Sequence, residues 1–124
     1  RLFPELRDMS PLDGAKEAAR LSGAGILLKG AHTVIADPKG YVWQVLSSDP
    51  WVARAGWGDV LAGYVAGLGA LGCAGSTDLS HDLLAGAALI HSESALQCKE
   101  ASSASDVALS LSTLTRKMQG KIVT

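Results

Sequence analysis

The chain has 124 residues, of which 48% are hydrophobic and 19% charged, and its net charge is −1. This make-up indicates one globular domain with a real core and argues against intrinsic disorder. The weak net charge shows no basic surface for nucleic acid, so we expect no nucleic-acid partner. The two cysteines, Cys73 and Cys98, lack metal-ligand and CxxC spacing, which favours free thiols and a cytoplasmic location.

The first predicted element is a helix that begins at Pro11. Ser10 precedes this proline, and small or apolar residues recur at helical spacing as far as Leu21. Residues 22–25, Ser-Gly-Ala-Gly, end the helix. The chain starts at Arg1 and enters regular structure almost at once, so we expect it to be part of a longer protein.

Three strands are predicted next. Residues 26–28 form a short continuous apolar run, which is typical of a strand buried on both faces. Residues 33–36 and 41–46 are rich in β-branched and aromatic side chains. Between them, residues 37–40 (Asp-Pro-Lys-Gly) supply a turn acid, a fixed φ and a residue that tolerates positive φ, so a β-hairpin is predicted.

A helix is predicted after the glycine-rich stretch that ends at Asp59. Its apolar positions lie on one helical face: Val60, Leu61, Tyr64, Val65, Leu68 and Leu71. Gly63 and Gly67 lie within it at a cost of about 1 kcal/mol each relative to alanine. We expect a close approach of a sheet, a second helix or a ligand to offset that cost. Residues 60–77 are uncharged but hold five glycines, which favours a buried helix over a membrane span.

Two more helices are predicted, one over residues 78–99, capped by Thr77 or Asp78, and one opened by Ser105 and Asp106. The last helix continues through Met118, with apolar positions at Val107, Leu109, Leu111, Leu114 and Met118. With neither a linker nor a repeat, residues 1–124 are predicted to form a single α/β unit: a helix, three strands with a hairpin, then three helices.

Residues 55–59, Ala-Gly-Trp-Gly-Asp, form the first candidate site. Glycines directly before a helix let backbone N–H groups converge, and with the helix dipole they form an anion site that commonly holds phosphate. Asp59 could act there as a general base on a group held beside the phosphate. The alternative is that Asp59 caps the helix, the commoner use of such an acid, while Gly56 and Gly58 only form the turn.

The second candidate is the segment Lys29, Gly30, Ala31, His32 and Thr33, at the end of the first predicted strand. Strand ends in parallel α/β sheets are where ligands bind, and a lysine there can pair with phosphate. The alternative is a strand-end lysine that only reaches solvent.

The histidines do not predict a metal site. His81 and His91 are ten residues apart, which places them on different faces of the predicted helix. We expect them to be surface or partly packed residues, and we predict no metal ligands in the chain.

Taken together, these segments resemble the C-terminal half of ADP-dependent NAD(P)H-hydrate dehydratase, a family of the ribokinase-like superfamily. The resemblance is carried by LKGAHTVIA (residues 28–36), the turn 37–40, GWGDVLAG (56–63), an alanine-rich helix with His-Ser, and ASDV (104–107). It covers nearly the whole chain from Leu12 onward. It implies the C-terminal half of a three-layer α/β/α fold.

The resemblance also implies roles for the candidate residues. The segment from Lys29 to Thr33 is expected to contact the adenine nucleotide, Gly56 and Gly58 its phosphates, and Asp59 the hydrated nicotinamide as acid/base. The implied reaction dehydrates (S)-NAD(P)H hydrate to NAD(P)H. ADP or ATP is consumed because it phosphorylates the leaving hydroxyl, and Mg²⁺ is the expected metal cofactor. We also expect a homo-oligomer.

Two other functions stay open. One is a small-molecule kinase of the same superfamily, acting on a sugar or hydroxymethylpyrimidine, with Asp59 activating the substrate hydroxyl. The other is a degenerate, non-catalytic nucleotide-binding module. Arg54 and Trp57 favour the latter, because they stand where the family has small residues and Trp57 is bulky for a loop that wraps phosphate.

Overall fold

The structure, a computed structural model, describes residues 2–46, 55–74, 81–98 and 103–122. The chain forms, in order, a short 3-10 helix η1 (Pro4–Leu6), α1 (Pro11–Ser22), β1 (Ile26–Leu28), β2 (His32–Ala36), β3 (Val42–Leu46), α2 (Trp57–Ala74), α3 (His81–Gln97) and α4 (Ala104–Ile122). Apart from η1, this is the predicted order of one helix, three strands and three helices.

The ends of α1 follow directly from its sequence. The Ser10 hydroxyl accepts a hydrogen bond from the Asp13 N–H (3.1 Å), and Pro11 occupies the first helical position. Gly23, with φ of 67°, ends the helix in the left-handed region, and its N–H donates to the Ala19 carbonyl. The predicted helix is therefore confirmed at both ends.

The three strands form an antiparallel sheet in the order β1-β2-β3. At the turn between β2 and β3, the Asp37 N–H donates to the Tyr41 carbonyl (3.0 Å) and the Asp37 carboxylate accepts from the Tyr41 N–H (2.8 Å). Gly40 has a φ of 95°, which a residue without Cβ adopts at little cost. The predicted hairpin is confirmed.

The expectation that residues 26–28 are buried on both faces is wrong. Their strand, β1, pairs only with β2 among the described strands, and Leu28 is 40% exposed. The buried strand is instead β2, the middle strand, in which Val34, Ile35 and Ala36 are fully buried. A continuous apolar run does not tell an edge strand from a central one.

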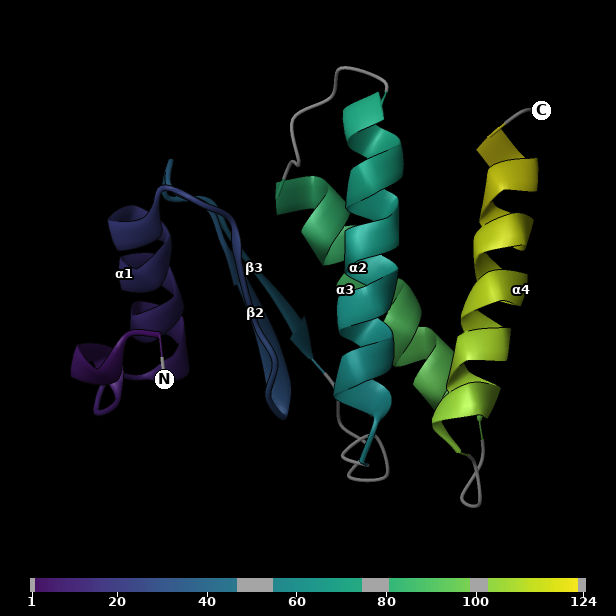
Figure 1. Ribbon diagram of the computed structural model, residues 1–124, viewed down its shortest axis with the longest axis horizontal. Helices are drawn as coiled ribbons and strands as arrows, with labels where there is room; N and C mark the ends of the chain where they lie inside the picture. Colours follow the sequence, from purple (N-terminus) through teal and green to yellow (C-terminus); the bar gives the residue numbers. More distant parts are fainter. Residues whose placement is uncertain (1, 47–54, 75–80, 99–102, 123–124) are drawn as a thin grey trace.

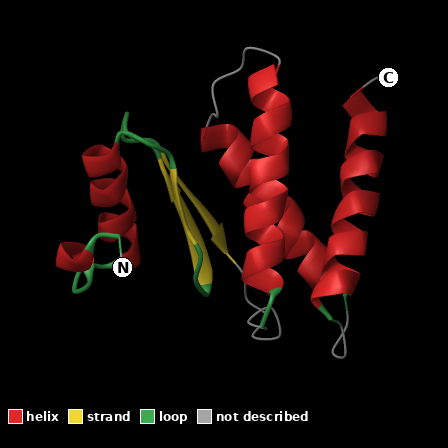
Figure 2. Cartoon of the chain, in the orientation of Figure 1, coloured by secondary structure: helices red, strands yellow, loops and turns green. Residues whose placement is uncertain are grey.

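Helices lie on both faces of the sheet (Figures 1 and 2). On one face, Ala15 and Ala19 of α1 pack against Val34 and Ala36 of β2. The other face is covered by α3, where Leu84 and Ala88 pack against Ile35. The remaining helices, α2 and α4, pack against α3 and against each other. The fold is α/β, as predicted.

The helix predicted from Val60 begins three residues earlier, at Trp57. Its buried face includes Leu61, but Leu71 is 73% exposed, contrary to the predicted apolar face. In α4, Leu109 is also mispredicted and is 71% exposed. It lies two positions, roughly 200° around the helix, from the buried Val107 and from the buried Leu111.

Helix α4 begins at Ala104, one residue before the predicted start at Ser105, and a reciprocal pair of hydrogen bonds caps it. The Ser103 N–H donates to the Asp106 carboxylate (2.7 Å), and the Asp106 N–H donates to the Ser103 hydroxyl (3.3 Å). The Ser103 N–H and the Ser103 hydroxyl, which also donates to the Asp106 carboxylate (2.7 Å), hold the pKa of Asp106 below its ordinary value. The predicted caps of the preceding helix, Thr77 and Asp78, lie outside the described residues, as does the side chain of Met118.

Among the described residues, neither a strand of the sheet nor a second helix comes close to Gly63 or Gly67, contrary to the first two predicted possibilities; the third, approach of a ligand, stays a prediction. Apart from the adjoining backbone of α2 itself, a Cβ atom on either glycine would meet nothing within 4 Å in the described part of the chain. Both face an open groove instead. Within the described ranges, no helix has the length and apolar character needed to cross a membrane.

Candidate functional site

The turn before α2 requires glycine at Gly56. Its φ of 82° lies in the left-handed region, and a Cβ there would come within 3.1 Å of the Ala104 Cβ at the start of α4. The first helical hydrogen bond runs from the Val60 N–H to the Gly56 carbonyl (3.0 Å). The amides of Gly58 and Asp59 precede that bond and have no acceptor within the helix. The start of α2 therefore presents backbone donors at the positive end of the helix dipole.

The side chain of Lys29 lies over this first turn. Lys29 follows β1 directly, and a Cβ built on Gly58 would be 3.7 Å from its Cδ and 3.9 Å from its Cε. Those distances are ordinary contacts, and Gly58 is not among the glycines with positive φ. The fold therefore tolerates alanine at Gly58, and the glycine leaves its backbone open. One anion could meet both the lysine ammonium and the open amides.

Only part of the predicted nucleotide-binding segment, Lys29 to Thr33, lies at a common cavity. Lys29, Gly30 and Thr33 line a small cavity with residues of α2 and α3. Ala31 and His32 are exposed and do not belong to the described lining. The strand end thus meets the start of α2, although the sheet is antiparallel rather than parallel.

Trp57 does not obstruct the turn. Its side chain is 1% exposed and packs with Ala95, Val107 and Leu111 between α3 and α4. The indole lies in the core and leaves the approach to the first turn clear. The argument that its bulk prevents phosphate binding is therefore wrong. Arg54, the other unusual residue, lies outside the described residues.

His91 is buried directly beneath the turn, contrary to the expected surface or partly packed position. It is 3% exposed, and its Nε2 lies 2.9 Å from the Trp57 carbonyl oxygen. Since a carbonyl only accepts, Nε2 carries the proton and donates. Burial lowers the pKa of His91, the bond to Trp57 opposes this, and the nearby charge of Lys29 lowers it further. The imidazole is therefore neutral at neutral pH.

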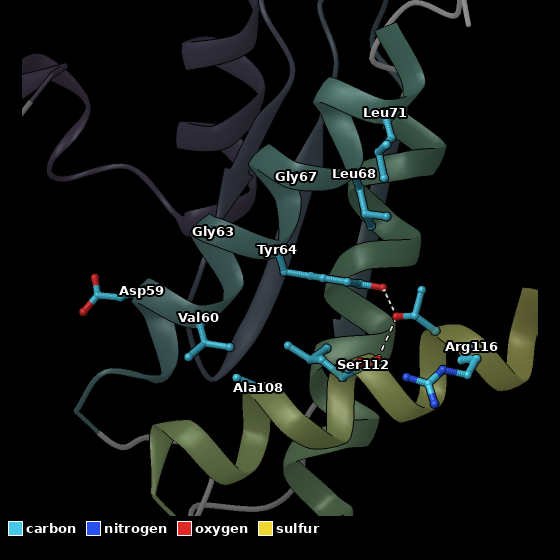
Figure 3. Close-up of a pocket in the computed structure, with 12 residues that line it drawn as sticks. Asp59, Val60, Gly63, Tyr64, Gly67, Leu68, Leu71, Ala108, Ser112 and Arg116 are labelled. Carbon is cyan, nitrogen blue, oxygen red and sulfur yellow. Dashed lines mark hydrogen bonds between the residues drawn. The ribbon is translucent and has the colours of Figure 1, made fainter. Parts of the chain in front are cut away.

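Asp59 is exposed and lies within the first turn of α2. The helix begins two residues before it, so Asp59 does not occupy the position of an N-cap. In Figure 3 its carboxylate points away from Tyr64 and from α4, out from the start of the helix. The carboxylate therefore lies at the same helix start as the open Gly58 amide.

A groove of about 590 Å³ runs from Asp59 along α2 and α4 (Figure 3). One hydrogen-bond chain crosses it: Thr115 Oγ1 donates to the Leu111 carbonyl (2.8 Å) and therefore accepts from the Tyr64 hydroxyl (2.7 Å). Its other lining residues are mainly small or apolar, with Arg116 from α4. Sequence periodicity gave no sign of this groove, because it depends on how two helices pack.

The family is shown by comparison with known sequences. A model of the NAD(P)H-hydrate dehydratase family matches residues 1–117. The chain belongs to this family. The resemblance seen in the sequence motifs is thereby confirmed.

Relatives in this family are named bifunctional NAD(P)H-hydrate repair enzyme Nnr. The chain is 46% identical to the Synechocystis protein over 68 residues, which are 55% of this chain and 13% of that protein. It is 49% identical to the Thermosynechococcus vestitus protein over 70 residues (55% and 14%) and 51% identical to the Thermofilum pendens protein over 63 residues (51% and 12%). The matched stretch thus spans only 12% to 14% of the length of these relatives. No solved structure matches the chain.

Proposed function

We propose that this chain supplies the nucleotide site and the acid/base of an ADP- or ATP-dependent NAD(P)H-hydrate dehydratase, which converts (S)-NAD(P)H hydrate to NAD(P)H. The observation that carries the proposal is the meeting of Lys29 with the open first turn of α2, where Asp59 also lies. Family membership and the printed name of the relatives support the same reaction.

The residues present suit the phosphates of an adenine nucleotide. The Lys29 ammonium and the Gly58 N–H offer a positive charge and a directed donor, and Gly58 leaves the space that a Cβ would fill. Gly56 shapes the turn, and Gly30, Ala31, His32 and Thr33 are assigned to the nucleotide beside Lys29. Among the described residues, no group of three or more His, Cys, Asp or Glu gathers to hold a metal. The Mg²⁺ in the proposal would be held through the nucleotide phosphates.

The chemistry proposed for these residues is the one that the family resemblance implies, and their places at one turn are consistent with it. Bound ADP or ATP would supply its terminal phosphoryl group, whose P–O bond to the nucleotide breaks to leave AMP or ADP while a new P–O bond forms to the substrate hydroxyl oxygen. That oxygen would then depart as inorganic phosphate when its C–O bond breaks, and loss of a proton from the neighbouring carbon completes the dehydration. Asp59 accepts the proton of that hydroxyl. Lys29 and the Gly58 N–H stabilise the negative charge on the transferring phosphoryl group.

The proposal extends to architecture and assembly. We assign residues 1–124 to the C-terminal portion of a ribokinase-like domain, in a cytoplasmic homo-oligomer. Helices on both faces of the sheet support the fold assignment. The exposed side chains of Leu71, Leu89 and Leu109 supply apolar surface for self-association.

The test is recovery of NADH from its hydrate. The protein is mixed with NADH hydrate and ADP or ATP, and absorbance is followed at the NADH wavelength. We expect recovery by the wild type and a loss of about 10²- to 10⁴-fold in Asp59→Asn. Asp82→Asn, which changes an exposed acid in the first turn of α3, is the matched control and should retain activity.

Absence of recovery by the wild type, or full activity of Asp59→Asn, would contradict the proposal. A phosphorylated product from a sugar or pyrimidine alcohol would favour a kinase instead. Trp57 no longer supports the non-catalytic alternative, because its side chain is buried in the core.

A further inference from the structure

The peptide that joins Trp57 to Gly58 connects a buried histidine with the candidate phosphate site. Its carbonyl accepts the hydrogen bond from His91 Nε2, at 2.9 Å. Its N–H is that of Gly58, beside Lys29. Because a peptide unit is planar, its carbonyl and N–H point in opposite and coupled directions. Whatever fixes the Trp57 carbonyl therefore fixes the direction of the Gly58 N–H.

The peptide lies in the first turn of α2, where the helical pattern already directs its carbonyl toward the Leu61 N–H, and the bond from His91 is a further one that ties this turn to α3. His91 is itself held firmly, since it lies on α3 one turn after Ala88, which packs against the sheet. The histidine thus ties the start of α2 to the packed core.

A neutral histidine suits this position better than a cationic side chain. As a neutral imidazole it gives one donor to the Trp57 carbonyl and places no second positive charge beside Lys29. An anion at the turn can then meet the full charge of Lys29 without disturbing the anchor.

We infer that His91 is a positioning residue: its hydrogen bond to the Trp57 carbonyl aims the Gly58 N–H at the anion bound at the start of α2. That the anion is a nucleotide phosphate rests on the proposed function. His91 is assigned no contact with nucleotide or substrate.

Two variants that differ only in reach test this inference. The side-chain amide of His91→Gln can place its N–H near the position of Nε2, whereas that of His91→Asn is too short to reach the carbonyl. We expect ADP affinity, measured by titration calorimetry, to fall about tenfold in His91→Asn and to stay within about threefold of the wild type in His91→Gln. Leu84→Ala, a core truncation elsewhere on α3, controls for lost stability and should keep its ADP affinity.

A second readout separates this inference from the proposed function. In ¹⁵N-labelled protein without ligand, the Gly58 amide resonance should shift in His91→Asn and return in His91→Gln. If the wild type binds no ADP, the nucleotide site fails, and the Gly58 resonance alone decides the positioning role. The inference would be overturned if His91→Asn bound ADP as tightly as the wild type, or if its Gly58 resonance did not move. It would also be overturned if His91→Gln or Leu84→Ala lost as much ADP affinity as His91→Asn.

Discussion

Two pairs of glycines lie along the same helical segment in different surroundings. Gly56 and Gly58 form the start of α2, where Ala104 and Lys29 lie close to them. Gly63 and Gly67 lie further along and face the open groove, with no described atom beyond the adjoining backbone of α2 near enough to contact an added Cβ.

The difference shows that the loss of helix stability caused by a glycine does not by itself tell why the glycine is there. In the interior of a helix, where Gly63 and Gly67 lie, glycine costs about 1 kcal/mol relative to alanine, whereas at the N-cap position of Gly56 it is a favoured residue. Gly56 has a reason in backbone geometry, because its φ is positive. Gly58 has none, since the fold leaves room for alanine, and ligand approach is the explanation that we propose. Within the described residues, the structure gives no explanation for Gly63 or Gly67.

The largest expected effect comes from removing the lysine beside Gly58. Lys29→Ala should weaken ADP binding by about 1.5–3 kcal/mol, the range for a hydrogen bond to a charged group. Lys39→Ala, in the exposed turn of the β2–β3 hairpin, is the matched control and should bind ADP normally. Titration calorimetry measures both, and equal affinities in the two variants would remove Lys29 from the site.

The next effect distinguishes backbone strain from ligand binding. Gly56→Ala and Gly40→Ala both force alanine into a positive φ, which should lower the free energy of unfolding by about 1–2 kcal/mol. The loss should be larger at Gly56, where the new Cβ also meets Ala104 at 3.1 Å. Urea denaturation measures it. Only Gly56→Ala should also weaken ADP binding, and the assignment fails if Gly40→Ala weakens it equally.

The buried histidine predicts a smaller, pH-dependent effect. Because burial holds the pKa of His91 below its ordinary value of about 6.5, the unfolded chain takes up the proton first as pH falls. The stability contributed by neutral His91 is therefore complete above about pH 6.5 and is lost as pH falls from there toward the folded-state pKa. Urea denaturation from about pH 8 to about pH 5 should show a shallower decline in His91→Gln. Parallel curves would refute a buried, neutral His91.

The smallest effect concerns the groove. Gly63→Ala and Gly67→Ala should each raise the free energy of unfolding by up to about 1 kcal/mol, because the added methyl meets open space and alanine favours the helix. Thermal unfolding measures the change. Destabilisation by either alanine would show that another surface packs closely on the groove.

Features encoded by adjacent residues were predicted well from the sequence. The Ser10–Pro11 start of α1, the hairpin turn at Asp37 and Gly40, and the convergence of glycines before α2 all depend on local backbone preferences. The family motifs also marked the segments that meet at the start of α2.

Features that depend on distant contacts could not be predicted in this way. The exposed edge position of β1 follows from its pairing with β2 and not from its apolar residues. The hydrogen bond from His91 to Trp57 spans 34 residues and has no local signal. The burial of the Trp57 indole likewise depends on α3 and α4, so the sequence alone could not decide whether its bulk would obstruct the turn.

The central claim is that the start of α2 binds nucleotide phosphate through the open backbone at Gly58. Its most direct test is the ADP affinity of Gly58→Ala, with Gly63→Ala as the control for the same change in the same helix. We expect Gly58→Ala to bind ADP at least about tenfold more weakly while its melting temperature stays equal to or above that of the wild type, and Gly63→Ala to bind normally. Wild-type affinity in Gly58→Ala would contradict the claim.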